Sequence, residues 1–424
     1  MNALPGFRDF YPQSCAVRNY IFESWRRVLG TYGYVEYDAP LLESTELYRK
    51  KSGDEILNQL FYFTDKGERE VALRPELTPS LARMVISQGR LYKLPLKWFS
   101  VGQFFRYEKQ QRGRQREFYQ LNCDLIGREG CRADAELLSI AVDVLRDLGL
   151  SAADVVVRVS DRKAWARFLS YSGVSESNIP TVLQLVDKLE KDDSKKIQES
   201  LASCGIGLDE LRRFIDCGGT GFFEDYELLR ADMESRGLAD FIELDPSVVR
   251  GLAYYTGMVF EVFDRQKKLR AVAGGGRYDG LLPLFSDGKL DWPAVGFGMG
   301  DVVLLELIRQ TPGALKKMEL TLQLQSPVQV YAVIASEEHR GTALSLIQQL
   351  RDQGFRVDYD LQSRPVKVHK QFQLADASGA PFAVVFGDEW PQVRLKDLKQ
   401  RSETVIAAEK LLSYLRDRVS PSRD

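Results

Sequence analysis

The chain has 424 residues, 44% of them hydrophobic, which predicts two or three domains and a large buried core. A formal net charge of −2 excludes a global attraction to nucleic acid, so any nucleic-acid surface must be a local basic patch. Because the only histidines are His339 and His369, chemistry that needs several histidines is nearly excluded.

Cysteine spacing and hydropathy indicate the compartment. The five cysteines form no C-x-x-C pair, which argues against a zinc site or a disulfide framework and favours a reducing compartment. Residues 1–12 contain no apolar run typical of a signal peptide. No stretch approaches the roughly 20 apolar residues that a membrane span needs. We therefore expect a soluble, cytoplasmic protein without a membrane partner or a bound metal.

The N-terminal part of the chain predicts a helix followed by a pair of strands. Apolar residues recur every four positions from Val17 to Leu29, which predicts a helix over 16–32 that ends at Gly33. The next elements expected are an extended segment over 34–42, strands over 98–107 and 117–126 joined by a polar basic loop, and a helix over 134–148.

The composition changes between Gly173 and Gly237, where the sequence is helical in pattern and rich in charge. We interpret 173–237 as an inserted helical module that separates residues 1–172 from residues 238–310. Strand character returns at 258–263 and 268–272.

A linker is predicted over 311–327, because it contains Pro312, Gly313 and Pro327. Beyond it the pattern alternates between strands and helices, which predicts a small α/β domain over 328–424. Its expected strands are 328–335, 355–360 and 381–386, and its expected helices are 340–353, 368–377 and 403–415. The chain as a whole is expected to have a mixed α/β (α+β) fold.

The most informative segment is 104–127, F-F-R-Y-E-K-Q-Q-R-G-R-Q-R-E-F-Y-Q-L-N-C-D-L-I-G. Alternate residues of a strand share a face, so one face of the second strand presents Phe118, Gln120, Asn122 and Asp124. The opposite face is mainly apolar. The polar face can be a solvated side of an antiparallel sheet or a ligand-binding surface, and an aromatic residue such as Phe118 fits a solvated face poorly.

The loop over 109–116 has four basic residues in eight positions and a glycine, Gly113, that permits a tight turn. A solvated basic loop is one interpretation. Arginine also binds phosphate oxygens through its planar fork, so Arg112, Arg114 and Arg116 can instead form a clamp for a triphosphate or an RNA backbone.

This hairpin resembles motif 2 of the class II aminoacyl-tRNA synthetases. Phe105-Arg-Tyr-Glu108, the basic loop and Arg116-Glu-Phe-Tyr-Gln120 follow that motif in order, and the run from Arg114 to Gln120 is similar to that of histidyl-tRNA synthetases. The block Arg250-Gly-Leu-Ala-Tyr-Tyr255 resembles the R-G-L-D-Y-Y signature of the same family.

Further blocks resemble the family in the family's own order. They are Leu4-Pro-Gly-Phe-Arg-Asp9, the motif 1-like segment from Tyr32 to Glu43, Leu73-Arg-Pro-Glu-Leu-Thr78, and Gly274-Gly-Gly-Arg-Tyr-Asp-Gly280. The resemblance therefore covers essentially the whole chain.

The resemblance implies an antiparallel six-stranded catalytic sheet flanked by helices, formed by residues 1–172 and 238–310, in a homodimer. Residues 328–424 would be an anticodon-binding domain. The implied partners are histidine, ATP with its Mg²⁺, and the tRNA for histidine, with no DNA. Histidine would be activated to histidyl-adenylate with release of pyrophosphate and then transferred to the 3′ end of the tRNA. Neither step needs a protein nucleophile, so catalysis would be positioning and charge stabilisation.

For ATP, the resemblance implies roles in and near the hairpin. Arg106 would bridge the histidine carboxylate and the α-phosphate, and Arg250 would lie against the same phosphate, so that both are catalytic. Glu108 would accept from the adenine amino group, and Phe118 would stack on the base. The outer phosphates would be held by two loop arginines, Arg114 and Arg116.

For histidine, Glu76 and Thr78 would bind the α-amino group, and Asp124 with one tyrosine would bind the imidazole. The complete implied set of histidine ligands is Glu76, Thr78, Arg106, Gln120, Asp124, Arg250, Tyr254 and Tyr255. Without the preceding Arg250, the tyrosine pair would indicate core packing, and Gly274 to Gly276 alone would indicate a simple turn.

Contacts with tRNA are expected at two places. Gln111 and Arg112 lie in the basic loop, and Lys367, Lys370 and Gln371 lie in the C-terminal domain, where unstacked anticodon bases would be read. A solvated helix start is the alternative interpretation of the last three residues.

Two positions depart from the family. Its third motif is approximately G-F-x-x-G-x-x-R, with an arginine that grips the ATP tail, but Gly296-Phe-Gly-Met-Gly300 is followed here by Val303 at the arginine position. Arg277 and Arg112 are candidates to supply the missing charge. Ala253 stands where the family usually has Asp.

Two other functions fit some of these features. A catalytically degenerate paralogue of the histidyl enzymes would bind histidine as a regulatory protein, but such proteins typically lack the anticodon domain and lose the motif residues. A class II synthetase for another amino acid would lack the block from Arg250 to Tyr255.

Overall fold

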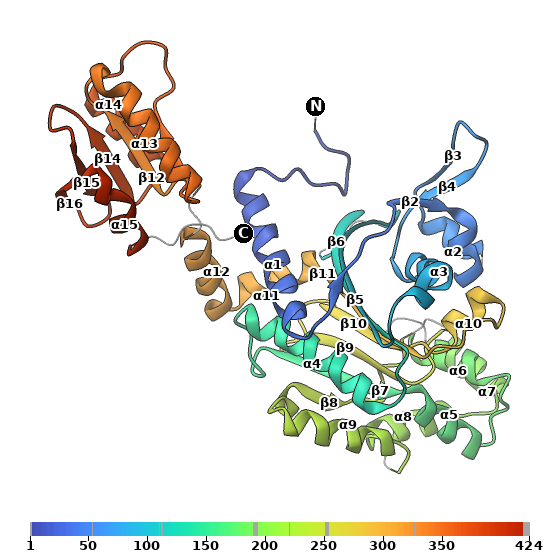
Figure 1. Ribbon diagram of the computed structural model, residues 1–424. Coiled ribbons are helices and arrows are strands. Elements are labelled where there is room, and N and C mark those ends of the chain that lie inside the picture. The colour runs from blue at the N-terminus through green and yellow to red at the C-terminus, as the bar shows by residue number, and fades with distance from the viewer. Residues whose placement is uncertain are drawn as a thin grey trace. The chain divides into compact units, whose positions relative to one another are not determined.

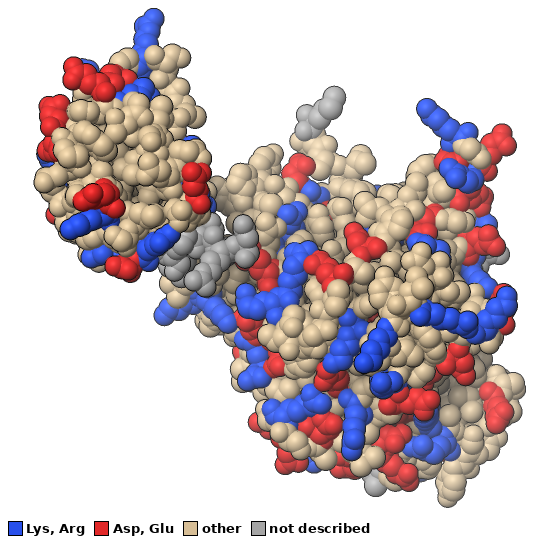
Figure 2. Space-filling model, in the orientation of Figure 1, with Lys and Arg blue, Asp and Glu red and all other residues tan. Residues whose placement is uncertain are grey.

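The computed structural model describes residues 2–52, 54–109, 111, 113–189, 194–219, 221–250, 254–324 and 327–418. The chain divides into two compact units, residues 1–318 and 319–424. Among the described helices, none is both long and apolar enough to cross a membrane. On the face drawn in Figure 2, acidic and basic side chains are interspersed over each unit, in keeping with the net charge of −2.

An eight-stranded sheet forms the centre of the larger unit (Figure 1). In order across the sheet, its strands are β1 (Val35–Glu36), β5 (Leu96–Phe105), β6 (Glu117–Ile126), β11 (Ala294–Gly300), β10 (Ala273–Arg277), β9 (Met258–Asp264), β7 (Val155–Asp161) and β8 (Ile242–Leu244). The six strands from β5 to β7 pair antiparallel, which confirms the expected sheet. The short edge strands β1 and β8 pair parallel to their neighbours.

Helices α1 (Pro12–Thr31) and α4 (Cys131–Asp147) lie side by side along one face of this sheet (Figure 1). Helix α4 forms because apolar side chains recur at helical spacing, and it buries Leu138, Val142 and Leu145 completely. Tyr119 of β6 points to this helical face, where its ring lies 5.1 Å from that of Phe22 in α1. Helices α9 (Glu224–Ser235) and α11 (Asp301–Gln310) pack beside α4 and on β6, respectively.

The opposite face is covered by α3 (Thr78–Gln88) and α10 (Leu281–Ser286). An apolar cluster joins Leu81 and Val85 of α3 to Ile126 and Val259 of the sheet. Beside it lie α2 (Thr45–Ser52) and a small sheet of β2 (Leu42–Ser44), β4 (Glu70–Leu73) and β3 (Tyr62–Thr64). Because Asp124 shares a strand face with Ile126, the polar face of β6 is directed under this cover and is not a solvated sheet surface.

Residues 162–235 contain helices with a core of their own. They are α5 (Arg162–Tyr171), α6 (Ile179–Val186), α7 (Ser194–Ser203) and α8 (Leu208–Asp216), and α9 touches this core through Tyr226. The rings of Phe168 and Phe214 stack in this core with centroids 3.8 Å apart. Helix α5, which precedes residue 173, shares the core through Trp165.

The smaller unit contains a five-stranded sheet of order β13 (Val357–Tyr359), β12 (Val330–Ile334), β14 (Phe382–Phe386), β15 (Gln392–Asp397) and β16 (Ser402–Ala407). The first three strands are parallel and the last two are antiparallel. Its helices are α13 (Arg340–Asp352), α14 (Val368–Ser378) and α15 (Leu411–Arg416).

Two of the expected elements were wrong. The predicted helix over 403–415 begins as strand β16, because Thr404, Val405 and Ile406 pair with β15, and only its end is helical. The predicted strand over 268–272 is a loop, because the Asp264 carboxylate accepts from the backbone N–H groups of Lys268 and Leu269 and so withdraws them from any sheet. The strand forms instead at the glycines that follow it.

Helix α12 (Pro312–Leu324) occupies most of the segment for which the sequence indicated a linker. Its first half packs on the larger unit, because Ala314 and Met318 are buried and Lys317 donates to the carbonyl oxygen of Asp147. This half of the helix therefore belongs to the core of residues 1–318.

We expect a chain that ends after Leu324 to be more stable than one that ends after Gln310, because only the longer chain keeps α12. Burial of one side chain the size of methionine contributes roughly 1.5–3 kcal/mol, so the difference in unfolding free energy should be at least about 2 kcal/mol. Urea unfolding of the two truncated chains, followed by circular dichroism, measures it. Equal midpoints would contradict the packing assigned to α12.

Candidate active site

The polar face of β6 lies over a floor made by glycines of β11. Gly296 is the cross-strand partner of Asp124, and Gly298 that of Asn122. A Cβ atom on Gly296 would overlap an Asp124 carboxylate oxygen, and one on Gly298 would lie 2.5 Å from the Gln120 amide nitrogen. The side chains of Asp124 and Gln120 therefore lie across β11, in space that any residue other than glycine would fill.

Arg250 extends over a third glycine, Gly274, which lies in the adjacent strand β10. Gly274 of β10 pairs with Glu261 of β9, and the Arg250 guanidinium lies over Gly274 in an ion pair with Glu261. Arg250 has a φ of +49°, a left-handed conformation that a residue other than glycine keeps only when its surroundings hold it. Burial opposes its charge, but the neighbouring Tyr255 and the Glu261 carboxylate together raise the pKa of Arg250 above its usual value. A cation is therefore held on the sheet.

The Arg106 guanidinium is fixed at the end of β5. Its Nε donates to the Pro75 carbonyl oxygen at 3.0 Å, and its Cζ lies 5.1 Å from the centroid of the Phe118 ring. Phe118 also packs against Phe104, with ring centroids 5.8 Å apart. These contacts hold one cation against one aromatic ring.

Four of the residues predicted for the site surround Arg106 closely enough to act on its charge. Burial lowers the pKa of Arg106, while the carboxylates of Glu76 and Glu108 raise it and the guanidinium groups of Arg114 and Arg250 lower it. The residues come from separate parts of the chain, so the fold brings the predicted catalytic pair, Arg106 and Arg250, together with both carboxylates.

The tip of the hairpin is a tight turn. Arg114 N–H donates to the Gln111 carbonyl oxygen at 2.9 Å, and Gly113 has a φ of +76°. The Arg114 side chain forms an ion pair of 2.7 Å with Glu108, and Arg116 Nε donates to the Glu108 carbonyl oxygen at 3.2 Å. Arg112, a predicted tRNA contact, lies outside the described residues.

Asp124 is the carboxylate on the polar face of β6, and only 4% of its surface is exposed. Tyr278 donates its hydroxyl hydrogen to Asp124 Oδ1. Burial raises the pKa of Asp124 to about 7, even though the hydrogen bond from Tyr278 acts in the opposite direction. The carboxylate therefore changes charge near neutral pH.

Tyr254 and Tyr255 pack against each other beside these groups. Their ring centroids are 4.6 Å apart. Burial raises the pKa of Tyr254, as do the carboxylates of Glu76 and Asp124, while Arg250 lowers it. Thr78, the remaining predicted histidine ligand, is half-buried at the first residue of α3.

The structure adds residues that the sequence did not single out. Lys51 of α2 forms an ion pair with Glu76, its side chain is 1% exposed, and its ammonium lies 4.2 Å from the centroid of the Tyr254 ring. Glu261 and Tyr278 hold Arg250 and Asp124, respectively. Tyr278 stood within the glycine-rich block and could have been suspected, whereas nothing in the sequence set Lys51 apart from the neighbouring Arg49 and Lys50.

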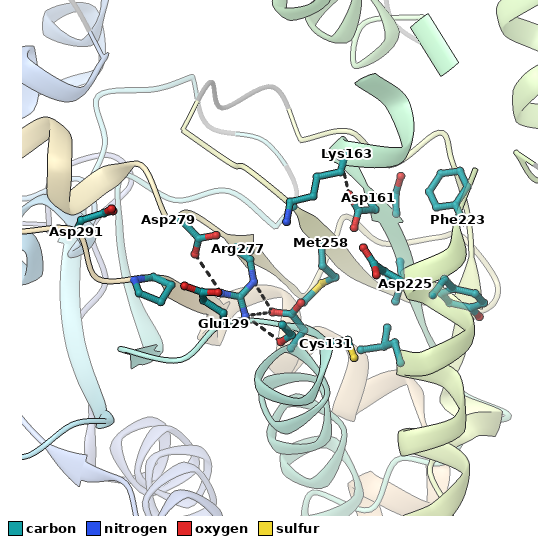
Figure 3. A pocket seen from close by; sticks show the side chains of 18 residues that line it. Glu129, Cys131, Asp161, Lys163, Phe223, Asp225, Met258, Arg277, Asp279 and Asp291 are labelled. Atoms are coloured by element: carbon teal, nitrogen blue, oxygen red, sulfur yellow. Dashed lines mark hydrogen bonds and ion pairs between the residues drawn. The ribbon is translucent and has the colours of Figure 1, made fainter. Parts of the chain in front are cut away.

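Arg277 does not compensate for the missing motif 3 arginine. It is 3% exposed and donates to the carboxylates of Asp134 and Asp279 and to the carbonyl oxygens of Arg128 and Gly130. Figure 3 shows it in a separate cavity of about 340 Å³ next to α4. Arg277 is thus a structural residue. The other departure from the family, Ala253, lies outside the described residues.

The predicted anticodon contacts fall into two groups. Lys367 and Lys370 are exposed at the start of α14. Gln371 is 2% exposed, accepts from the Ile334 N–H and donates to the carbonyl oxygens of Ile334 and Val366, each at 2.8 Å. Its side chain therefore ties α14 to β12 and is not available to RNA, which corrects the interpretation of Gln371.

Comparisons with known proteins agree along the whole chain. The family model described as histidyl-tRNA synthetase matches residues 6–301, and the one described as anticodon binding domain matches residues 329–418. A histidine–tRNA ligase of Opitutus terrae is 43% identical over 98% of this chain and 98% of its own length. The chloroplastic/mitochondrial histidine–tRNA ligase of Arabidopsis thaliana is 42% identical over 87% of this chain and 76% of its own length.

The histidyl-tRNA synthetase of Nostoc sp. PCC 7120 has the same fold, with a TM-score of 0.77 at 23% identity over 98% of this chain and 99% of that one. Together, the sheet, the arginine-rich hairpin and the C-terminal unit define an aminoacyl-tRNA synthetase. The family match and the identity to curated relatives specify it further: the chain belongs to the histidyl-tRNA synthetase family.

Gly274→Ala should displace Arg250 without removing it, because the added methyl group overlaps the guanidinium. Loss of one preorganised charge typically costs about 10²-fold or more in rate, so histidine-dependent ATP–pyrophosphate exchange should fall by that order. Gly300→Ala is the matched control, since a Cβ there meets nothing within 4 Å. An unchanged exchange rate in a folded Gly274→Ala variant would show that the position of Arg250 is unimportant.

If Asp124 pairs with the histidine imidazole, as the family resemblance implies, Asp124→Asn should weaken histidine use while leaving the KM for ATP nearly unchanged, because it removes the negative charge. The defect relative to wild type should be largest above pH 7 and shrink as pH falls, since Asp124 then becomes neutral by itself through its pKa of about 7. The kcat/KM for histidine of both proteins between pH 6 and 8.5 measures this. A defect that is equal at both ends of the range would contradict it.

Thermal unfolding supplies the control for Asp124→Asn. The folded-state pKa of about 7 lies above the value near 4 of an unfolded aspartate, so the carboxylate destabilises the fold increasingly from about pH 4 to pH 7. The full effect is roughly 4 kcal/mol above pH 7. The variant should therefore gain in melting temperature relative to wild type more at pH 8 than at pH 5.

Proposed function

We propose that the protein is a histidine–tRNA ligase that works in two steps. A carboxylate oxygen of histidine attacks the α-phosphorus of ATP, forming the histidyl-adenylate bond as the bond to pyrophosphate breaks. A ribose hydroxyl at the 3′ end of the tRNA then attacks the histidyl carbonyl carbon. Its proton is lost, the tRNA ester forms, and AMP leaves.

The observation that carries this proposal is the group of charges around Arg106. The first step brings two anions together, the histidine carboxylate and the α-phosphate, and negative charge grows on the leaving pyrophosphate. Arg106 and Arg250 act on each other's charge, and each is fixed by a hydrogen bond to another group. Two cations held in place before the reaction can align the anions and stabilise the charge without reorganising.

The hairpin supplies the adenine and phosphate contacts of this proposal. Phe118 is fixed against Arg106 and Phe104, which suits a ring that stacks on a base. The carboxylate of Glu108 is half-buried beside Arg114 and would accept from the adenine amino group. Arg114 and Arg116 would then face the outer phosphates, with Mg²⁺ entering as the counter-ion of ATP.

The carboxylates supply histidine selection. Asp124 would accept from an imidazole N–H, beside Tyr254 and Tyr255, and Gln120 lies on the same face of β6. A pocket with buried polar groups rejects analogues that leave those groups unpaired, so discrimination does not require a separate editing site. Glu76 and Thr78 would bind the α-amino group next to Lys51.

The smaller unit would read the anticodon, with Lys367 and Lys370 as exposed cations near the bases or the backbone. Gln111 and Arg112 would contact tRNA from the hairpin tip. We include a homodimer built on the motif 1-like segment, where Val35, Leu41 and Leu42 are exposed apolar residues. The five free cysteines suit the reducing cytoplasm as the place of action.

The alternative of a regulatory paralogue is less well supported. The anticodon-domain match and the full-length identity to ligases favour an active enzyme, as do the retained Arg106 and Arg250. An ATP–pyrophosphate exchange assay over a panel of amino acids separates these functions. We expect exchange with histidine alone, reduced about 10²–10³-fold in Arg250→Ala with little change in histidine binding. Histidine binding without exchange would indicate the regulatory protein, and exchange with another amino acid would indicate another specificity.

A further inference from the structure

The triphosphate end of ATP needs more positive charge than the hairpin offers. Of the two described hairpin arginines assigned to the tail, Arg114 is already paired with Glu108. Arg116 donates to the Glu108 carbonyl oxygen and lies with its Cζ 4.5 Å from the Tyr107 ring centroid. At the start of α11, where the family has an arginine, Val303 contributes no charge.

Arg270 lies next to Val303, at the tip of the hairpin. A Cβ atom built on Gly113, at the hairpin tip, would lie 3.2 Å from a Val303 methyl carbon and 4.0 Å from Arg270 Cδ. The Arg270 stem and the Val303 side chain therefore flank the same point on the turn. The Arg270 guanidinium continues past it and donates to Gln111 Oε1 on that turn.

The backbone explains why residue 270 can substitute for residue 303. Strand β10 pairs with β11 from Ala273↔Met299, and the Gly300 N–H donates to the Val272 carbonyl oxygen at 3.2 Å. The chain just before β10 thus runs beside the chain that enters α11. An arginine side chain from either segment can reach the space next to the hairpin tip.

The charge environment of Arg270 also fits a ligand. Arg270 is exposed, and among the described residues its guanidinium donates to the neutral side-chain amide of Gln111. By contrast, Arg277 is held by carboxylates in a separate cavity. A guanidinium paired only with an amide keeps its full charge for an incoming anion, and its planar fork suits phosphate oxygens.

We propose that Arg270 binds the outer phosphates of ATP and replaces, from the loop before β10, the arginine that is absent at Val303. The proposal rests on the function proposed above. It makes Arg270 a substrate-binding residue for the β- and γ-phosphates, with no contact to the adenosine or to histidine.

Equilibrium titration of the full-length protein with ATP and with AMP tests this assignment. A hydrogen-bonded charge typically contributes about a 10- to 100-fold change in affinity, so Arg270→Ala should weaken ATP binding by that factor. AMP binding should stay unchanged, because AMP lacks the outer phosphates. Arg270→Lys should retain part of the ATP affinity. Lys268→Ala is the matched control, since it removes one exposed charge from the same loop.

A second experiment places an arginine at position 303 of α11. Val303→Arg in the Arg270→Ala background should recover ATP affinity, whereas Val303→Arg alone should bring no gain, because the position is already occupied. Unchanged ATP affinity in Arg270→Ala, or an equal loss for ATP and AMP, would overturn the assignment. These binding results are independent of turnover. A wild-type protein that fails to exchange pyrophosphate would refute the proposed function, while the ATP and AMP titrations would still decide the role of Arg270.

Discussion

The site depends on the absence of side chains at three positions of two adjacent strands. Strands in a sheet lie only about 4.8 Å apart, so a polar side chain can lie across a neighbouring strand only where that strand has no Cβ. Gly296, Gly298 and Gly274 provide this space under Asp124, Gln120 and Arg250, respectively. Glycine within a strand destabilises it by roughly 0.5–1 kcal/mol. The long pairing of β5 with β6 and the helices α1 and α4 packed on the far face offset that cost. The sheet thus forms the core and would also carry the binding surface.

Burial disfavours the charged form of both Arg106 and Asp124. It lowers the pKa of Arg106 and raises the pKa of Asp124 to about 7. The hydrogen bonds that hold these groups come from neutral partners, the Pro75 carbonyl for Arg106 and the Tyr278 hydroxyl for Asp124, while Glu76 and Glu108 act on Arg106 only through their charge. Such groups reduce the stability of the free protein, but they are available to a ligand that brings the opposite charge. Arg250 differs, because Glu261 keeps it charged and in place.

The alternation along 117–126 was sufficient to predict strand β6 and its two faces, because one side of the strand is apolar and packs against α1. The roles of Arg106 and Arg250 came from resemblance and remain predictions, although the fold brings the two residues together. Lys51 could not be found from the sequence, because its burial depends on α2 packing against Glu76 and Tyr254. The sequence did not predict strand β10, because its glycines make no hydrophobic pattern. The space that Gly274 leaves for Arg250 is visible only in the folded chain.

Lys51 bears on how the proposed histidine-binding part of the site would work. The Glu76 carboxylate would pair with the α-ammonium group of histidine, yet it already forms an ion pair with the Lys51 ammonium. A substrate bringing only a positive charge would therefore meet a neutralised partner and a neighbouring cation. Free histidine is a zwitterion, and its carboxylate can compensate Lys51 and Arg106 while its ammonium shares Glu76. A decarboxylated analogue such as histamine would leave both cations uncompensated, and leaving a buried charge unpaired is costly. If Glu76 binds the α-ammonium group as proposed, the Lys51–Glu76 pair would favour ligands that carry the carboxylate on which the first chemical step depends.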